Sequence, residues 1–275
     1  MDRIRFGPPI MSNLFVVATP IGNLEDLSAR ALRILGEVDV IAAEDTRVTG
    51  RLLARHAIRK PMLSYRAPVE RRGLPRVLEA LERGDVALVS DAGTPAVNDP
   101  GQVLVAAAWA AGHRVVPIPG PSAVAAALSA SGFGGPGYLF LGYLPRKPGE
   151  LRRLLATLAD QERPSVAFES PYRVAKALAA LAEVLPDRLV MVGRELTKLH
   201  EEILRGTPSE VAARLHGRER GEFYACDLRC QLKRRSSSAW PGPTPTARAT
   251  SVTWQGLACP RTSSRATSGY SGPTF

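Results

Sequence analysis

The chain has 275 residues, of which 45% are hydrophobic and 23% are charged, a composition typical of globular proteins. No apolar run approaches the roughly 20 residues needed to span a bilayer, and residues 1–13 lack the apolar core of a signal peptide. These features argue against a membrane-spanning or secreted protein, so we expect a cytoplasmic location. We interpret residues 1–12 as a disordered N-terminal extension, because Met11 is a second plausible start.

The formal net charge of +10 is unevenly distributed along the chain. Residues 223–275 contain seven Lys or Arg residues and a single Asp, so most of the excess positive charge lies there. A basic protein attracts anions, nucleic acid included, but this distribution makes the total charge weak evidence about the rest of the chain. Cys226, Cys230 and Cys259 are too few for a disulfide framework or a zinc site, and we predict no metal site.

Strand and helix patterns alternate from residue 14 onward. Short apolar runs rich in β-branched residues predict strands, and the amphipathic patterns between them predict helices. The predicted strands are 14–18, 38–43, 86–90 and 114–118, separated by helices over 28–36, 47–56, 73–83 and 101–111. Such alternation is typical of a parallel-rich sheet covered by helices. We therefore predict an N-terminal α/β domain over residues 13–131.

A glycine-rich stretch, GFGGPG at 132–137, separates a second set of elements from the first. It matches G-x-G-x-x-G, but it follows a helix, precedes a strand and contains Pro136. We therefore interpret it as a hinge rather than a dinucleotide-binding loop. The predicted strands beyond it are 138–144, 165–170 and 188–193, with helices over 149–160, 171–184 and 207–216. This set predicts a C-terminal α/β domain over residues 132–222.

The composition of the sequence changes after Glu222. Of the 40 residues from 236 to 275, 24 are Ser, Thr, Pro or Gly, too polar a composition to offset the entropy of ordering. We predict an irregular, basic tail over 223–275. Its scattered Trp240, Trp254 and Cys259 are unusual for a linker, and we interpret the tail as an out-of-frame read that begins after RGEF.

The loops that directly follow the predicted strands carry the strongest functional signal, because ligands of open α/β sheets bind at the carboxyl ends of the strands. In the first domain these loops are TPIGNLEDLS, EDTR, SDAGTPAVNDPG and PGPSA, all rich in glycine, proline and polar residues. In the second domain two strands end in FESPYR and GRELTKLHEE. We predict that the loops form a ligand site in a cleft between the two domains.

Structural interpretations exist for most of these loops. The first can be a turn in which Asp26 or Ser28 caps the next helix, and Ser122 can be an ordinary helix-start hydroxyl. The third loop is harder to explain in this way. Gly93 lets the backbone approach whatever lies above the sheet, and Asp91 stands at the strand terminus.

The charged loops also leave alternatives open. Asp45 can cap its helix while Glu44 and Arg47 form a surface ion pair, which contributes roughly 0–1 kcal/mol. The charges of GRELTKLHEE, residues 193–202, can belong to a solvated turn.

Taken together, the motifs resemble those of a known family. VATPIGNLEDLSARA, AAEDTR, SDAGTPAVNDPG, PIPGPSA, FLGYLP, FESPYR and RELTKLHEE occur in this order between about residues 13 and 222. This pattern is similar to that of the ribosomal RNA small subunit methyltransferase I family, the 16S rRNA cytidine 2′-O-methyltransferases of the tetrapyrrole methylase superfamily. Motifs like SDAGTP and PGPSA occur across the superfamily, whereas TPIGNL, EDTR, ESPYR and RELTK together are specific to this branch.

The resemblance implies two α/β domains, S-adenosylmethionine in the cleft between them, a homodimer, and small-subunit rRNA or the 30S subunit as substrate. The implied cofactor-binding residues are Pro20, Asp91, Gly93, Thr94, Pro95, Ser122, Ala123, Glu169 and Glu195. Methyl transfer to a ribose hydroxyl requires a base or a stabiliser of the developing alkoxide. The catalytic candidates are Glu44, Asp45, Arg47, Glu195 and Lys198. The candidates for RNA backbone contacts are Arg47, Arg173 and Arg194.

The chain departs from the family pattern in two places. SYRAPVERRG replaces a segment that usually contains His and Asn, and RGEFYACDLRC replaces a final strand and a basic helical region. The second departure has three possible consequences: weaker RNA docking, an unpaired edge strand, or loss of activity. Two other functions stay open: a tetrapyrrole (corrin precursor) methyltransferase, and an inactive RNA- or cofactor-binding protein.

Overall fold

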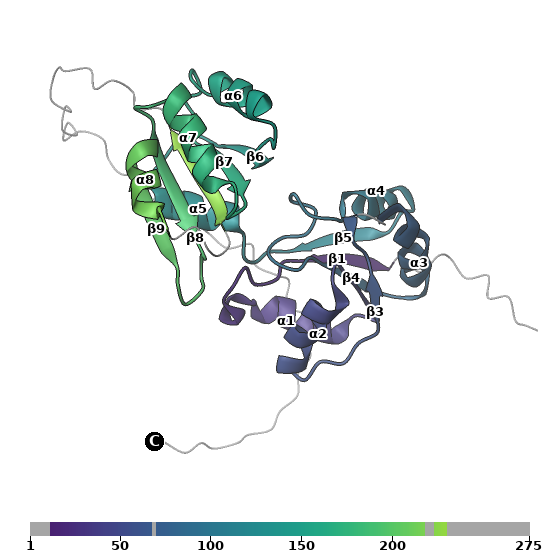
Figure 1. The fold of residues 1–275 in the computed structure, drawn as a ribbon. Helices are drawn as coiled ribbons and strands as arrows, with labels where there is room; N and C mark the ends of the chain where they lie inside the picture. The colour runs from purple at the N-terminus through teal and green to yellow at the C-terminus, as the bar shows by residue number, and fades with distance from the viewer. Residues whose placement is uncertain (1–11, 68–69, 218–222, 230–275) are drawn as a thin grey trace, which may run out of the picture. The chain divides into compact units, whose positions relative to one another are not determined.

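The computed structural model describes residues 12–67, 70–217 and 223–229, all of which fall within one compact unit (Figure 1). Residues 1–11 lie outside the described part of the chain. Ser12, which we had assigned to the disordered extension, is instead buried, and its carbonyl accepts a hydrogen bond from the Arg114 N–H at 3.2 Å. Among the described residues, no helix has the length and apolar character needed to cross a membrane.

The first sheet is parallel throughout its described pairings and has the order β3-β2-β4-β1-β5. Its strands are β1 (Asn13–Val17), β2 (Val40–Ala43), β3 (Met62–Ser64), β4 (Val86–Val89) and β5 (Arg114–Ile118). All but β3 lie where the apolar runs predict them. β3 has only three residues, too few for an apolar run to stand out. Because the strands are parallel, their carboxyl ends meet at one edge of the sheet.

Helices cover both faces of this sheet (Figure 1). They are α1 (Ala29–Glu37), α2 (Thr46–Arg55), α3 (Glu70–Arg83) and α4 (Gln102–Ala110), with a short 3₁₀ helix at Leu24–Asp26. Side chains of α1 and α2 pack in one core cluster, and those of α3 and α4 pack in a second cluster on the opposite face. In α1 the buried residues are Ala31, Ile34 and Leu35, the spacing of an amphipathic helix.

The second sheet is mixed and has the order β6-β7-β10-β8-β9. Its strands are β6 (Leu139–Tyr143), β7 (Ser165–Glu169), β8 (Leu189–Arg194), β9 (Glu202–Gly206) and β10 (Phe223–Arg229). Only the β6–β7 pair is parallel, whereas β7–β10, β10–β8 and β8–β9 are antiparallel. The α/β fold predicted from the alternating pattern is therefore confirmed, with a more antiparallel second sheet.

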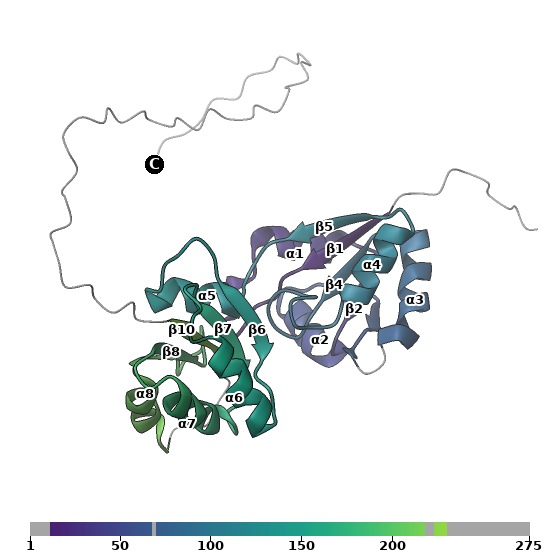
Figure 2. The same ribbon diagram turned by 90° about the horizontal axis from the view of Figure 1, so that it is seen from above.

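Helices also lie on both faces of the second sheet (Figure 2). They are α5 (Ala123–Ser131), α6 (Pro148–Thr157), α7 (Val174–Val184) and α8 (Pro208–Leu215). α6, α7 and α8 share one core cluster, and α5 packs on the other face against Val166 and Met191. The boundary at residue 132 stays a prediction, although the packing of α5 favours a boundary before this helix.

Strand β10 corrects the prediction that the chain is irregular from residue 223. Phe223–Arg229 pair antiparallel with both β7 and β8, so these two strands are not left with unpaired edges. The backbone of residues 223–229 can fill the space between β7 and β8 because the hydrogen bonds between strands do not depend on side-chain identity. Residues 230–275 lie outside the described residues, and the out-of-frame interpretation of them stays a prediction.

Shortening a buried side chain in the core on the α3–α4 face should lower stability substantially. Leu81 is fully buried there, so Leu81→Ala should lower the free energy of unfolding by about 2–5 kcal/mol. Leu199, which is 93% exposed, offers a control with the same chemical change and an expected effect below about 0.5 kcal/mol. Urea unfolding measures both. Equal effects of the two substitutions would contradict the described packing.

Candidate functional site

The loops that leave β1 and β4 are joined by a backbone bridge. The Thr19 N–H donates to the Gly93 carbonyl at 2.8 Å, and the Gly93 N–H donates back to the Thr19 carbonyl at 3.0 Å. The buried Thr19 hydroxyl also donates to the Ser90 carbonyl at 3.0 Å. Gly93 has a φ of 80°, a left-handed conformation that favours glycine. The bridge therefore fixes the start of the SDAGTP loop at the sheet edge.

A second pair of hydrogen bonds joins the loops after β2 and β4. The Asp45 N–H donates to Oδ1 of Asp91 at 3.0 Å, and the Asp91 N–H donates to Oε2 of Glu44 at 3.3 Å. Two carboxylates are thus held side by side by backbone donors rather than by cations. This arrangement leaves their negative charge available to a ligand.

A pocket of about 230 Å³ opens beside these carboxylates. It is lined by Ile21, Glu44, Asp91, Ala92, Gly93, Thr94, Val97, Asn98, Asp99, Ser122, Ala123, Val124, Tyr143 and Phe168. Five predicted cofactor residues line it, namely Asp91, Gly93, Thr94, Ser122 and Ala123. The Thr94 hydroxyl donates to the Pro121 carbonyl at 3.2 Å, which connects the loops after β4 and β5. We call this cavity the acidic pocket.

Tyr143 and Phe168 are lining residues that the sequence analysis missed. They belong to β6 and β7, and their rings meet edge to face at a centroid distance of 5.8 Å. Tyr143 is 61% exposed, unusual for an aromatic residue at the end of an apolar strand. An aromatic residue next to a polar strand end is a signal that the sequence carried, but ordinary core packing accounts for it equally well.

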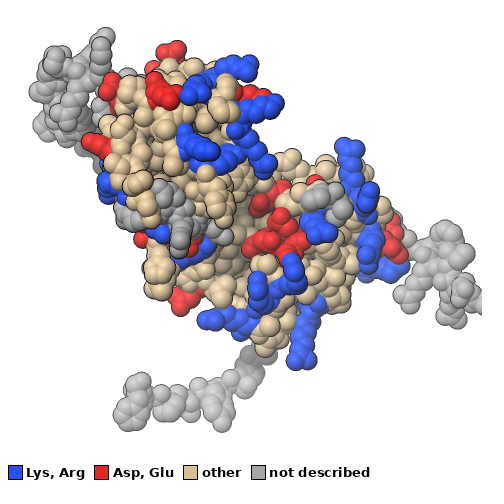
Figure 3. Space-filling view, in the orientation of Figure 1, with Lys and Arg blue, Asp and Glu red and all other residues tan. Residues whose placement is uncertain are grey.

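The carboxylates of the acidic pocket are held in an unfavourable electrostatic environment. Burial and the charges of neighbouring carboxylates raise the pKa of Glu44 and of Asp91. Burial, followed by the charge of Asp91, raises the pKa of Asp99. Figure 3 shows acidic side chains gathered on this face, with Lys and Arg side chains around them. Such a group of partly buried carboxylates favours a positively charged ligand.

Asp45 differs from these carboxylates. It caps α2 by accepting from the Arg47 N–H at 2.8 Å, and the Arg47 guanidinium binds both of its oxygens, at 2.6 and 3.1 Å. This pairing holds the pKa of Asp45 far below its usual range. The capping interpretation is therefore confirmed, as it is for Ser28 and Ser122. The expected surface pair is corrected: Arg47 binds Asp45 instead of Glu44, because the capping geometry holds Asp45 within its reach.

A second cavity, of about 540 Å³, adjoins the acidic pocket. It is lined by Glu44, Asp45, Thr46, Arg47, Ser64, Arg66 and Asp91. Glu44 and Asp91 line both cavities, so they stand between the two. Besides three carboxylates, two arginines line this cavity, Arg47 and Arg66, and for these we call it the basic-walled cavity.

The RELTK loop packs against the TPIGNL loop. The Asn23 N–H donates to the Thr197 hydroxyl at 2.9 Å, and a Cβ on Gly22 would lie 2.6 Å from Cγ of Lys198. Glu195 and Thr197 adopt positive φ values of 50° and 66°, which is strained for residues with a side chain. The loop is therefore held in one conformation by its contact with the first domain.

The structure does not bring every predicted residue to the acidic pocket. Glu195 and Lys198 form an ion pair at 3.3 Å and line no cavity described here. Pro20 lines a separate cavity of about 310 Å³ that also includes Asp91, and Pro95 is buried behind the loop surface.

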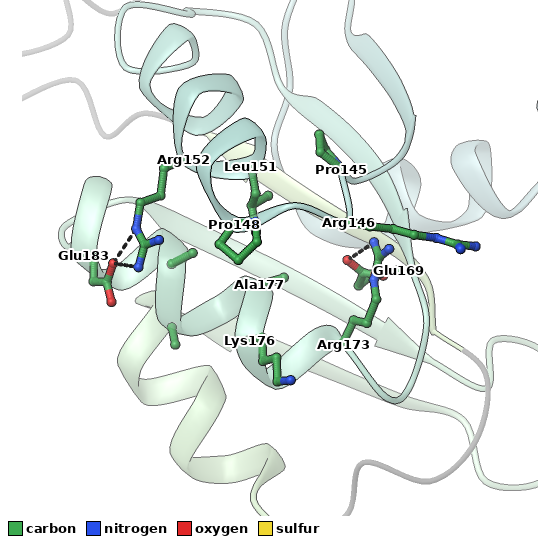
Figure 4. Close-up of a pocket in the computed structure, with 12 residues that line it drawn as sticks. Pro145, Arg146, Pro148, Leu151, Arg152, Glu169, Arg173, Lys176, Ala177 and Glu183 are labelled. Atoms are coloured by element: carbon green, nitrogen blue, oxygen red, sulfur yellow. Dashed lines mark hydrogen bonds and ion pairs between the residues drawn. The ribbon is translucent and has the colours of Figure 1, made fainter.

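The predicted RNA contacts in the second domain are ion-paired. Glu169 is only 2% exposed, and its two oxygens accept from Arg173 at 2.8 and 2.7 Å. Both residues line another cavity, on the α7 side of the sheet (Figure 4). Arg194 pairs with Glu202 at 3.1 Å. Alternation along β7 explains the position of Glu169, because Phe168 already occupies the face toward the acidic pocket.

Comparison with known proteins places the chain among methyltransferases. The family model of tetrapyrrole (corrin/porphyrin) methylases matches residues 13–212. The chain is 47% identical over 201 residues to ribosomal RNA small subunit methyltransferase I of Thermotoga maritima, with 73% of this chain and 90% of that protein covered. It is 46% identical over 214 residues to the protein of the same name from Neisseria meningitidis serogroup B, with 76% and 74% covered.

Solved structures support the same fold. Uroporphyrin-III C-methyltransferase of Thermus thermophilus, in complex with S-adenosyl homocysteine, gives a TM-score of 0.57 at 18% identity, covering 79% of this chain and 97% of that one. A cobalt precorrin-4 methyltransferase gives 0.60 at 18% identity, covering 82% and 97%. At such low identity the likeness concerns the fold alone.

The electrostatics of the acidic pocket predict that Glu44→Gln stabilises the folded chain at pH 7. Because the pKa of Glu44 is raised above its ordinary value of 4.5, ionisation of this group opposes folding, and the opposition is absent at lower pH. The urea midpoint of the variant should exceed that of the wild type at pH 7. The difference should vanish below about pH 4.

Glu210→Gln provides a control in which the expected change in stability at pH 7 has the opposite sign. Hydrogen bonds with Thr207 lower the pKa of Glu210, so its ionised form stabilises the start of α8. Glu210→Gln should therefore lower the midpoint at pH 7, and this effect should also fade on acidification. A midpoint for Glu44→Gln at or below that of the wild type at pH 7 would contradict the described electrostatics.

Proposed function

Because the chain belongs to the tetrapyrrole methylase family and, within it, to the ribosomal RNA small subunit methyltransferase I proteins, we propose that it methylates ribosomal RNA. The methyl donor is S-adenosylmethionine, and the acceptor is the 2′-hydroxyl of a cytidine in the 16S rRNA of the small subunit. The residues of the acidic pocket carry this proposal, because their arrangement suits a cationic, partly apolar cofactor.

The acidic pocket fits the chemistry of S-adenosylmethionine in two ways. Glu44 and Asp99 are partly buried, Asp91 is exposed, and all three carboxylates have raised pKa values, so a positive charge beside them relieves their mutual repulsion. Apolar side chains such as Ile21 and Val124 supply a surface for the adenosine. When bound, S-adenosylmethionine supplies an electrophilic methyl group on a positively charged sulfur.

The two adjoining cavities suggest how the substrates are divided. Arg66 of the basic-walled cavity is suited to a phosphate of the target nucleotide, whereas Arg47 is already bound by Asp45. Arg66 has no hydrogen-bond or ion-pair partner among the described residues. Glu44 and Asp91 stand between the cavities, next to the place where the methyl group and the ribose oxygen must meet. This placement supports cofactor binding on one side and nucleotide binding on the other.

Glu44 is the strongest candidate for the general base. A ribose hydroxyl is a poor nucleophile, and a carboxylate with a raised pKa accepts its proton more readily than an ordinary one. Asp45 is a poorer candidate because Arg47 lowers its pKa. In this mechanism Glu44 would take the hydroxyl proton while the oxygen–methyl bond forms and the methyl–sulfur bond breaks, so that the donor leaves as S-adenosylhomocysteine. Positioning by the two cavities would supply much of the rate.

The family resemblance also supports a homodimer that acts in the cytoplasm. Light scattering of the purified chain, coupled to size-exclusion chromatography, tests the assembly, and a mass of one chain would contradict the dimer. The assembled 30S subunit or its rRNA is the proposed partner.

The proposed activity predicts methyl transfer from labelled S-adenosylmethionine to small ribosomal subunits that lack the modification. Ribose-methylation mapping should place the label on the 2′-oxygen of a cytidine. Transfer to a tetrapyrrole but not to rRNA would contradict the proposal, and so would cofactor binding without transfer to either. The same assay therefore separates the proposed function from both other functions.

The roles of Glu44 and Asp91 predict different defects. Glu44→Gln should lower kcat by about 10²- to 10⁴-fold, because it removes the proton acceptor. Asp91→Asn should mainly weaken S-adenosylmethionine binding, measured by calorimetry. Glu25→Gln, at an exposed position outside both cavities, is the control and should change neither quantity. Wild-type kcat in Glu44→Gln would rule out Glu44 as the base.

A further inference from the structure

The second sheet carries a cavity outside the site described above. It has a volume of about 370 Å³ and lies between α6 and α7 (Figure 4). Its apolar part is formed by Pro148 and Leu151 of α6 and by Ala177 and Ala180 of α7. The remaining lining is mostly charged, and it determines what the cavity can bind.

Both carboxylates of this cavity are already neutralised by arginines. Glu169 pairs with Arg173 at the start of α7, and Glu183 pairs with Arg152 of α6, with closest distances of 2.7 and 2.8 Å. Figure 4 shows these two pairs as dashed contacts. Each pair contributes no net charge, so the other ionisable side chains determine the charge of the cavity.

Those other side chains are Arg146 and Lys176, both exposed. Neither has an ion-pair partner among the described residues. Lys176 lies in the first turn of α7, next to Arg173, and Arg146 follows β6. The cavity therefore has two excess positive charges, one in the first turn of α7 and one on the loop after β6. Such an excess attracts an anion that carries more than one negative group.

Tyr172 lies near the start of α7, and binding of a simple anion would not require an aromatic side chain there. It directly precedes Arg173, and 90% of its surface is exposed. An aromatic side chain exposed in this way is available to stack on a bound partner. Single-stranded RNA is recognised by this combination, in which a base stacks on an aromatic ring and phosphates contact basic side chains.

Strand alternation places this cavity and the acidic pocket on opposite faces of the second sheet. In β7, Phe168 lines the acidic pocket, and Glu169, the next residue, lines the cavity between α6 and α7. Tyr143, the last residue of β6, lines the acidic pocket, and Arg146, in the loop after β6, lines the cavity between α6 and α7. The two sites therefore occupy opposite faces of the same strand ends.

We propose that Arg146 and Lys176 bind phosphodiester groups of the substrate RNA and that Tyr172 stacks on one of its bases. This proposal rests on the proposed function, because it takes the bound nucleic acid to be the methylation substrate. It assigns RNA docking in the second domain to side chains without ion-pair partners, in place of Arg173, which the structure pairs with Glu169.

Fluorescence anisotropy with a labelled 12-nucleotide single-stranded RNA tests the proposal on the full chain. Arg146→Gln and Lys176→Gln should each reduce the slope of log affinity against log salt by about 0.7, the value for one single-strand phosphate contact. Tyr172→Ala should weaken binding about tenfold with an unchanged slope, and Tyr172→Phe should restore it. Arg76→Gln, an equal charge change at an exposed position on α3, should leave the slope unchanged.

Two further measurements distinguish the possible failures. Calorimetry should give every variant the wild-type affinity for S-adenosylmethionine, which shows that the fold is intact. If the wild type methylates small subunits but the three positions leave RNA affinity and salt slope unchanged, this inference is overturned and the proposed function stands. If the wild type neither binds the RNA nor methylates the subunits, both proposals fail.

Discussion

The parallel pairing of β2, β4, β1 and β5 is the constraint on which the rest of the structure depends. It brings the loops after all four strands to one edge of the sheet, where side chains far apart in sequence meet. Two pairs of hydrogen bonds then fix the loops, one between Thr19 and Gly93 and one among Glu44, Asp45 and Asp91. The Glu44 and Asp91 carboxylates are therefore held by backbone N–H donors, which leave their negative charge uncompensated.

The neighbouring carboxylates at this edge of the sheet lower the stability of the fold, which is typical of functional sites. Glu44, Asp91 and Asp99 repel one another and are partly removed from water, although a fold selected for stability alone would pair or separate them. The neighbouring Asp45 shows the alternative, since it forms an ion pair with Arg47 that lowers its pKa. A cationic cofactor supplies the missing positive charge, and this complementarity links the structure to methyl transfer.

Much of the fold follows from local sequence patterns, but not all of the site does. Helices and strands with clear periodicity lie close to their predicted bounds, and the caps at Ser28 and Asp45 follow from side-chain chemistry. Strand β10 was missed because a central strand is completed by its neighbours rather than by its own composition. The face on which Glu169 lies, away from the acidic pocket, depends on strand register, which motifs do not encode.

Calorimetric titration of the full chain with S-adenosylmethionine, beside the Val97→Trp variant, tests the central claim most directly. Val97 lines the acidic pocket and is 44% exposed, so a larger side chain there fills the cavity without disturbing the core. The account predicts saturable binding of one cofactor per wild-type chain and no detectable binding to the variant. No binding to the wild type, or equal binding to both proteins, would contradict it.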